Sequence, residues 1–191
     1  VAARPGILNV LVRKYFMNVA KSPGLLACCL FPPLFLLVFR FIIIEPVTHD
    51  DASMFLLVMG MLFSTSMVPG TTTVYPMAEA REKRTLRTME LAGVGRAQII
   101  AAHGIVGTLY TALAGAACFL VSGASFDSMP PFMAITVLAG VPLIALSLAL
   151  GLASRNQMAA SFSSLPVITT GIVPLFFMYA ESTFQALPLL P

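Results

Sequence analysis

Charged residues are scarce in this 191-residue sequence. Only 10% of the residues are Asp, Glu, Lys or Arg, whereas 58% are hydrophobic and the mean hydropathy is +0.92. A soluble domain carries charge on about a quarter of its residues. The charge available is too small to cover a water-facing surface, so the composition argues against a soluble protein. It indicates an integral membrane protein.

Cysteines and catalytic motifs are scarce as well. Cys28, Cys29 and Cys118 all fall in apolar stretches, so no loop carries the paired spacing of a disulfide framework or a zinc site. The chain has no phosphate loop of the GxxxxGK[ST] type, which excludes it as an ATPase by itself. His49 and His103 lie near predicted span ends without the partner set of a metal site or a catalytic triad. We therefore predict no catalytic residue, no cofactor and no metal.

Long uncharged stretches are what the sequence does contain. Four of them exceed the roughly 20 residues that a helix needs to cross a bilayer, and a fifth, 22–39, is long enough if Arg40 near its end is tolerated. Lipid leaves open strand edges unpaired, so every span should be helical. We predict an all-α integral membrane protein with about five transmembrane helices, at about 25–44, 54–74, 104–126, 132–153 and 158–180.

The basic residues lie between these spans and predict their orientation. Residues 1–24 form a basic leader without acidic residues, either an interfacial amphipathic helix or a simple basic flank. With this leader in the cytoplasm, ten of the eleven Lys and Arg residues fall on the inner side, as the positive-inside rule requires. Residues 181–191 would then form an external stub.

Arg40 is the one basic residue predicted on the outer side. It would anchor its helix at the membrane interface, either by extending to the headgroups or by pairing with Glu45. Contact with a transported substrate is the alternative.

The densest charge lies in the segment 76–103, between the second and third predicted spans. Residues 79–96 mix both signs at helical spacing, with Glu79 and Lys83 one turn apart. We predict a single helix there, ended by a turn that contains two glycines. A solvated polar loop is the alternative.

The order of these segments resembles the permeases of type-2 ATP-binding-cassette exporters. In that family this segment carries a Glu-Lys-rich stretch followed by Gly-Thr-Leu, and residues 82–86, EKRTL, match it, except that Arg84 stands where glycine is usual. The family's later small-residue turn is matched by 92–96. The resemblance implies six spans, so one is missing here. It also implies a homodimer or heterodimer of permeases that is coupled to two cytosolic ATPase subunits.

The resemblance further implies that the inner charged segment couples the permease to its ATPase. A helix with Leu86 and Met89 on one side would dock in a groove of that partner. The residues expected to make this contact are Glu79, Arg81, Glu82, Lys83, Arg84, Thr85, Leu86, Arg87 and Met89.

These features lead us to expect the permease subunit of an ATP-driven exporter in the plasma (inner) membrane of a bacterium. Its cargo would be amphipathic: a drug, a peptide or a lipid-like molecule. Its partners would be the ATPase subunit, a second permease and membrane lipid, and nucleic acid is not expected. The second hypothesis is a membrane scaffold or immunity-type protein without transport, and the third is a membrane-embedded enzyme.

Overall fold

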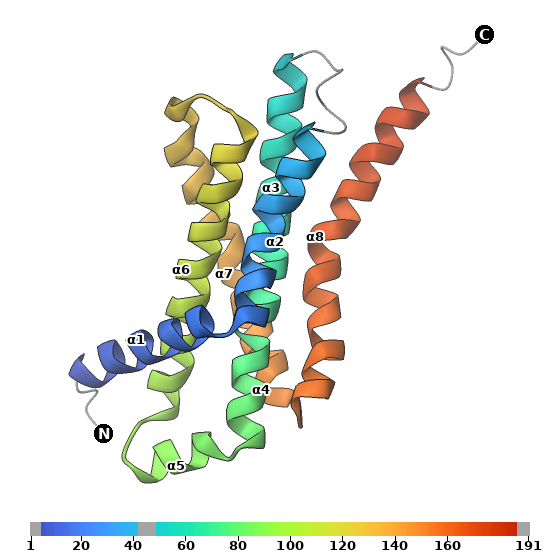
Figure 1. Cartoon of the computed structure of the whole chain (residues 1–191). Coiled ribbons are helices and arrows are strands. Elements are labelled where there is room, and N and C mark those ends of the chain that lie inside the picture. The colour runs from blue at the N-terminus through green and yellow to red at the C-terminus, as the bar shows by residue number, and fades with distance from the viewer. Residues whose placement is uncertain (1–4, 42–48, 187–191) are drawn as a thin grey trace.

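The computed structural model describes residues 5–41 and 49–186, and these residues form helices and short turns with no strand among them (Figure 1). The prediction of an all-α protein is therefore confirmed for the described part of the chain. The helices are α1 (Pro5–Lys21), α2 (Pro23–Phe39), α3 (His49–Thr72), α4 (Val74–Glu82), α5 (Thr85–Leu91), α6 (Arg96–Ser122), α7 (Met129–Ala153) and α8 (Gln157–Ala186), with a 3-10 turn at Phe126–Ser128.

Three helical segments are long and apolar enough to cross a membrane: Ser53–Glu82, Arg96–Ser122 and Phe126–Ala153. A fourth is added if α1 and α2, which meet at an angle of 80°, count as one broken span. The predicted fifth span, 158–180, falls within α8, a helix of 30 residues that continues past its predicted end to Ala186. Residues 187–191 of the predicted stub lie outside the described residues.

Helix α3 is the centre of the bundle and contacts α2, α6, α7 and α8. Glycines allow the closest of these approaches. A Cβ atom added to Gly171 of α8 would lie 2.1 Å from Ser66 Oγ and 2.6 Å from the Leu62 carbonyl oxygen, both on α3. A Cβ atom on Gly60 would lie 2.9 Å from that of Cys118, where α3 meets α6. Small residues thus bring the backbones together, as is usual between membrane helices.

Two pairs of small residues have the same four-residue spacing but differ in burial. Ser147 and Gly151 are buried, and a Cβ atom on Gly151 would lie 3.0 Å from the Val74 carbonyl oxygen. Ala112 and Ala116, in contrast, are only half-buried. Spacing alone did not indicate which pair lies in a tight crossing.

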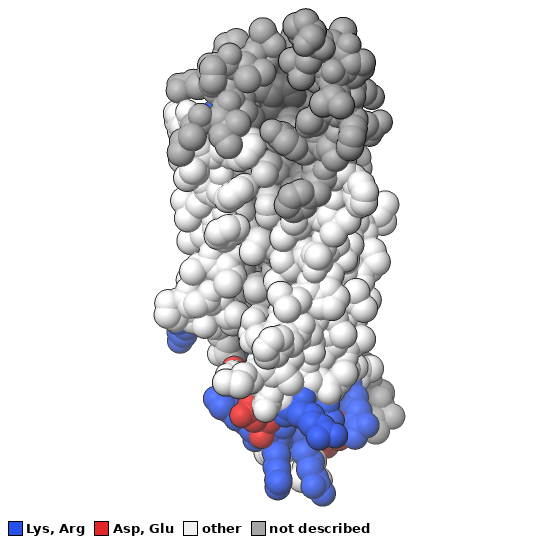
Figure 2. All heavy atoms as spheres, turned by 90° about the vertical axis from the view of Figure 1, so that its right-hand side faces the viewer, with Lys and Arg blue, Asp and Glu red and all other residues white. Residues whose placement is uncertain are grey.

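Exposed apolar side chains form a belt around the middle of the bundle. They include Leu34 on α2, Leu113 on α6, Leu138 on α7 and Phe162 on α8. Figure 2 shows a face almost free of charge over this length, with Lys, Arg, Asp and Glu gathered at one end. Soluble monomers seldom expose contiguous apolar patches beyond a few hundred Å². The belt is therefore compatible with a surrounding of lipid.

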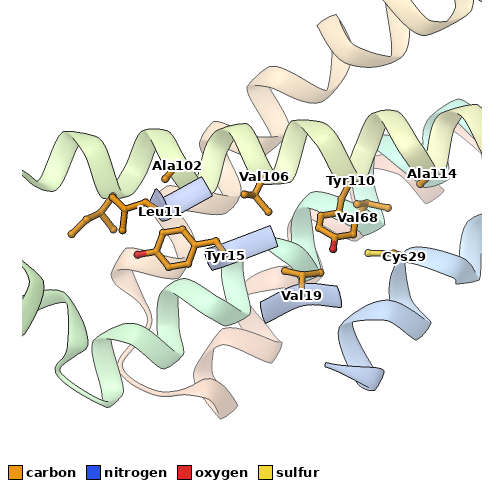
Figure 3. Packing of buried hydrophobic residues seen from close by; sticks show 10 residues of the cluster. Leu11, Tyr15, Val19, Cys29, Val68, Ala102, Val106, Tyr110 and Ala114 are labelled. Carbon is orange, nitrogen blue, oxygen red and sulfur yellow. The ribbon is translucent and has the colours of Figure 1, made fainter. Parts of the chain in front are cut away.

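We call the charged end the basic end; it contains α1, α5, the start of α6 and the turn between α7 and α8 (Figure 1). Helix α1 lies across this end and packs one stripe against α6. The stripe consists of Leu11, Tyr15 and Val19, at helical spacing, which are buried beside Ala102, Val106 and Tyr110 (Figure 3).

One stripe of α1 is thus buried, whereas Val10, outside this stripe, is 68% exposed. The Tyr110 hydroxyl donates a hydrogen bond of 3.0 Å to the Phe16 carbonyl oxygen and so fixes α1 on α6.

Candidate functional site

The charged segment between α3 and α6 consists of two short helices, so the prediction of one helix over 79–96 is wrong. Helices α4 and α5 meet at Lys83 and Arg84, and the chain then turns at Gly93, where φ is 85°, into α6. Figure 1 shows this excursion at the end of the bundle. We call α4, α5 and the turn to residue 95 the basal segment.

Arg84 creates the break between the two helices. Its φ of 54° and ψ of 16° lie in the left-handed region, and it is the one non-glycine residue with positive φ in the described part of the chain. In this region Cβ crowds the backbone, a crowding that glycine avoids. The conformation gives a physical reason why glycine suits this position. Arg84 adopts it at a cost in strain.

Two side-chain interactions brace this break. Lys83 Nζ lies 2.5 Å from Glu79 Oε1, which confirms the ion pair expected from the spacing, and the hydrogen bond and charge of Glu79 raise the pKa of Lys83. Thr85 Oγ1 donates a hydrogen bond of 3.1 Å to the Ala80 carbonyl oxygen across the break. Both side chains of the ion pair are exposed, so the pair itself contributes little stability.

Arg81 and Glu82 hold the turn between α7 and α8. Arg81 donates hydrogen bonds to the carbonyl oxygens of Leu152 and Ser154, the latter at 3.2 Å. Glu82 Oε2 accepts a hydrogen bond of 3.0 Å from the Gln157 backbone N–H. A cation thus meets the C-terminal end of α7, and an anion meets the N-terminal end of α8, each the favourable sign for the helix dipole. These two residues connect α4 to the last helical hairpin.

Leu86 and Met89 do not form a free apolar stripe. Both are half-buried against the protein's own core, and the Tyr15 hydroxyl of α1 lies 3.4 Å from Met89 Sδ. These contacts anchor α5 on the protein's own core. The exposed side of α5 carries Arg84, Arg87 and Leu91, and the last of these is 83% exposed.

A salt bridge connects the other end of α5 to α6. Arg96 donates two hydrogen bonds to the Glu90 carboxylate. Its Nη2 lies 3.0 Å from Oε2, and its Nε bonds to Oε1. The hydrogen bond from Arg96, together with its charge, lowers the pKa of the Glu90 carboxyl. Helix α5 is therefore held from α1, α4 and α6, and α4 is held from α7 and α8.

A hollow of about 480 Å³ lies between α1 and the basal segment beside their contact; we call it the basal cavity. Lys14, Tyr15 and Asn18 line it from α1, Glu79 and Lys83 from the basal segment, and His103 from α6. A second hollow, of about 510 Å³, lies on the other side of the basal segment and is lined by Arg81, Arg87, Glu90 and Arg96 over apolar side chains.

Sequence reasoning missed the lining of the basal cavity. The rings of Tyr15 and His103 are in contact, with centroids 3.8 Å apart and planes tilted by 37°, although the two residues are far apart in the sequence. Their contact depends on the angle at which α1 crosses α6, and no local pattern encodes that angle. In the described residues no group of three or more His, Cys, Asp or Glu side chains is placed to hold a metal ion.

Arg40 lies at the end opposite the basal segment and caps α6. Its Nη1 donates a hydrogen bond to the Val121 carbonyl oxygen, and its guanidinium lies against Gly123, whose φ of 72° ends the helix. A cation at a helix C-terminus interacts favourably with the helix dipole. Glu45, the other partner expected for Arg40, lies outside the described residues.

Comparisons with protein-family models, with curated proteins and with solved structures each found no match.

Proposed function

We propose that this chain is the membrane permease subunit of an ATP-driven exporter, with five spans, a cytoplasmic N-terminus and the basal segment as its contact with a separate ATPase. The resemblance of residues 82–86 to the type-2 exporter permeases supports this proposal, as does the concentration of basic residues at one end of the bundle. The chain carries no phosphate loop of its own, so nucleotide hydrolysis belongs to a partner.

The connection of the basal segment to the rest of the bundle is the observation that carries the proposal. Helix α4 follows α3 directly, and Arg81 and Glu82 attach it to the turn between α7 and α8. Helix α5 is attached to α6 through the salt bridge of Arg96 with Glu90. A push on α5 therefore reaches α3, α6, α7 and α8 together, as a coupling element must.

The exposed side of α5 supplies the surface on which a partner would push. Arg84 and Arg87 present two positive charges there without a side-chain hydrogen bond to any described residue, and Leu91 adds an apolar contact. This side is cationic, so the complementary surface of the ATPase subunit is an acidic groove with an apolar floor.

Movement of these helices would alternate access to a path for an amphipathic cargo. Helices α2, α7 and α8 contain internal prolines, which remove backbone hydrogen bonds and make local bending easier. A second permease, the same chain or a different one, would complete the assembly in the plasma membrane of a bacterium.

A photocrosslinking experiment tests the contact. A photoreactive phenylalanine analogue is placed at Leu91 and, as a control, at Phe126, which is also exposed but lies at the opposite end of the bundle. In cells of the source organism we expect Leu91 to crosslink to a protein that contains a GxxxxGK[ST] motif. Phe126 should not crosslink to it.

Charge reversal then tests whether the contact couples hydrolysis to transport. The ATPase identified by crosslinking is then reconstituted, without crosslinking, in proteoliposomes with the permease. The Arg84→Glu/Arg87→Glu variant should reduce the permease-dependent ATPase rate at least tenfold. Arg13→Glu/Arg155→Glu makes the same change in charge at exposed sites outside the basal segment and should leave the rate near its original value. Crosslinking without any effect of the charge reversal would favour the scaffold hypothesis, and no crosslink to a nucleotide-binding protein would refute the proposal.

A further inference from the structure

The basal cavity has the size and charge of an anion-binding site. Its volume of about 480 Å³ falls within the range of about 300–1,000 Å³ that small-molecule sites occupy. Three lysines and one glutamate line it, which leaves a surplus of two positive charges. Lys83 is paired with Glu79, so the surplus rests on the two lysines of α1, Lys14 and Lys21.

The donors on α1 lie in one row. Lys14, Asn18 and Lys21 follow one another at spacings of four and three residues, which places them on one face of the helix, and all three line the cavity. Neither Lys14 nor Lys21 forms a salt bridge with a described residue. Two ammonium groups and an amide therefore present donors to the same space. A phosphodiester offers the acceptor oxygens that such donors satisfy.

The inner wall of the cavity is apolar and contains one buried polar side chain. Val19, Leu25 and Val106 form the apolar part, and His103 beside them is 3% exposed. Its Nδ1 lies 2.9 Å from the Ile99 carbonyl oxygen, and a carbonyl only accepts, so Nδ1 carries the proton.

In the neutral form of the His103 ring, Nε2 is then an acceptor. It is buried and has no partner among the described residues. Buried polar groups of this kind nearly always find a partner, and a donor within the cavity, such as a hydroxyl group, would supply it.

We propose that the basal cavity binds the headgroup of an anionic membrane lipid. Lys14, Asn18 and Lys21 hold the phosphate, and His103 accepts a hydrogen bond from a headgroup hydroxyl. Helix α1 leaves α2 at 80° and lies across the basic end (Figure 1). The cavity thus combines a cationic rim with an apolar wall, which matches a lipid better than a free phosphate. This site does not depend on coupling to an ATPase.

Lipid titration of the purified full chain in detergent, read by native mass spectrometry, tests the site. We expect phosphatidylglycerol, which has a glycerol headgroup, to bind at least tenfold more tightly than phosphatidylcholine of the same acyl chains. Lys14→Gln/Lys21→Gln should weaken phosphatidylglycerol binding by roughly tenfold per lysine, since each removes a charge-assisted hydrogen bond. Arg13→Gln/Arg155→Gln removes the same charge from exposed residues outside the cavity and should retain the binding.

A competition with sodium phosphate distinguishes a lipid from a soluble anion. Millimolar phosphate should leave phosphatidylglycerol bound. If it displaces the lipid completely, the site belongs to a free phosphate compound and the lipid assignment is refuted. Equal binding of the two lipids to the native chain, or equal loss in the lysine and arginine double variants, would refute a site for an anionic lipid headgroup in this cavity.

Discussion

Replacing Arg84 tests the geometry of the basal segment, because this residue holds the left-handed turn between α4 and α5 at φ 54°. Arg84→Gly removes the crowding of Cβ, and Arg84→Ala removes the same long side chain but keeps Cβ. The comparison of these two variants therefore isolates the backbone. It also leaves Arg87 and Leu91, the other exposed residues of α5, unchanged.

The expected magnitude follows from two opposing terms. A residue with Cβ in the left-handed region costs roughly 1–2 kcal/mol. Glycine avoids this cost, but about 0.4–1 kcal/mol of the benefit is lost because glycine gives the unfolded chain more conformational freedom. Arg84→Gly should therefore be more stable than Arg84→Ala by about 0.5–1 kcal/mol. For a chain of this length such a difference shifts Tm by about 1–4 °C.

A thiol-reactive dye provides the assay, because Cys118 is 1% exposed in the folded chain and reacts on unfolding. The Arg84→Gly variant should unfold at a higher temperature than Arg84→Ala in the same detergent. Gly93 provides a control of opposite sign: its φ is 85° and open space surrounds it, so Gly93→Ala should lower Tm through the backbone alone. If Arg84→Gly is no more stable than Arg84→Ala while Gly93→Ala is destabilised, the left-handed turn at Arg84 is refuted.

Three further predictions concern other parts of the bundle. Gly171→Ala should destabilise the fold by at least about 2 kcal/mol through overpacking and should lower Tm in the dye assay. Gly24→Ala, which has no atom within 4 Å of the added Cβ, should leave Tm unchanged. Arg40→Ala should cost about 0.5–1 kcal/mol through loss of the cation at the end of α6, and an unchanged Tm would contradict this cap. The pKa of Glu90 is lowered in the folded state, so its salt bridge to Arg96 stabilises the fold at pH values above the ordinary carboxyl pKa of 4.5. This contribution is lost as the pH falls below that value. Glu90→Gln should abolish this part of the pH dependence of Tm.

The uncharged stretches of the sequence predicted the long helices well. A segment as apolar as 97–126 or 128–154 can satisfy its backbone in lipid only as a helix, and α6 and α7 occupy these stretches. The ion pair of Glu79 with Lys83 was predictable for a similar reason, since it depends only on helical spacing. Both features are local.

The features that the sequence did not reveal depend on contacts between distant residues. Local propensity favours one helix through Arg84, but packing of Leu86 and Met89 against α1 and α6 turns α5 away from α4. The burial of these two side chains also changes which face of α5 is exposed. Likewise, Gly171 allows a close approach of α8 to α3 without any distinctive spacing around it. Crossing angles decide such contacts.

The sidedness of the basal segment is the central claim of the proposed function, and cysteine labelling in intact cells tests it most directly. In a background with the three native cysteines replaced by alanine, Arg87→Cys and Phe126→Cys place one thiol at each end of the bundle. A membrane-impermeant maleimide should label Phe126→Cys in intact cells, and it should label Arg87→Cys only in inverted vesicles. Labelling of Arg87→Cys in intact cells would place the basal segment outside and contradict the account.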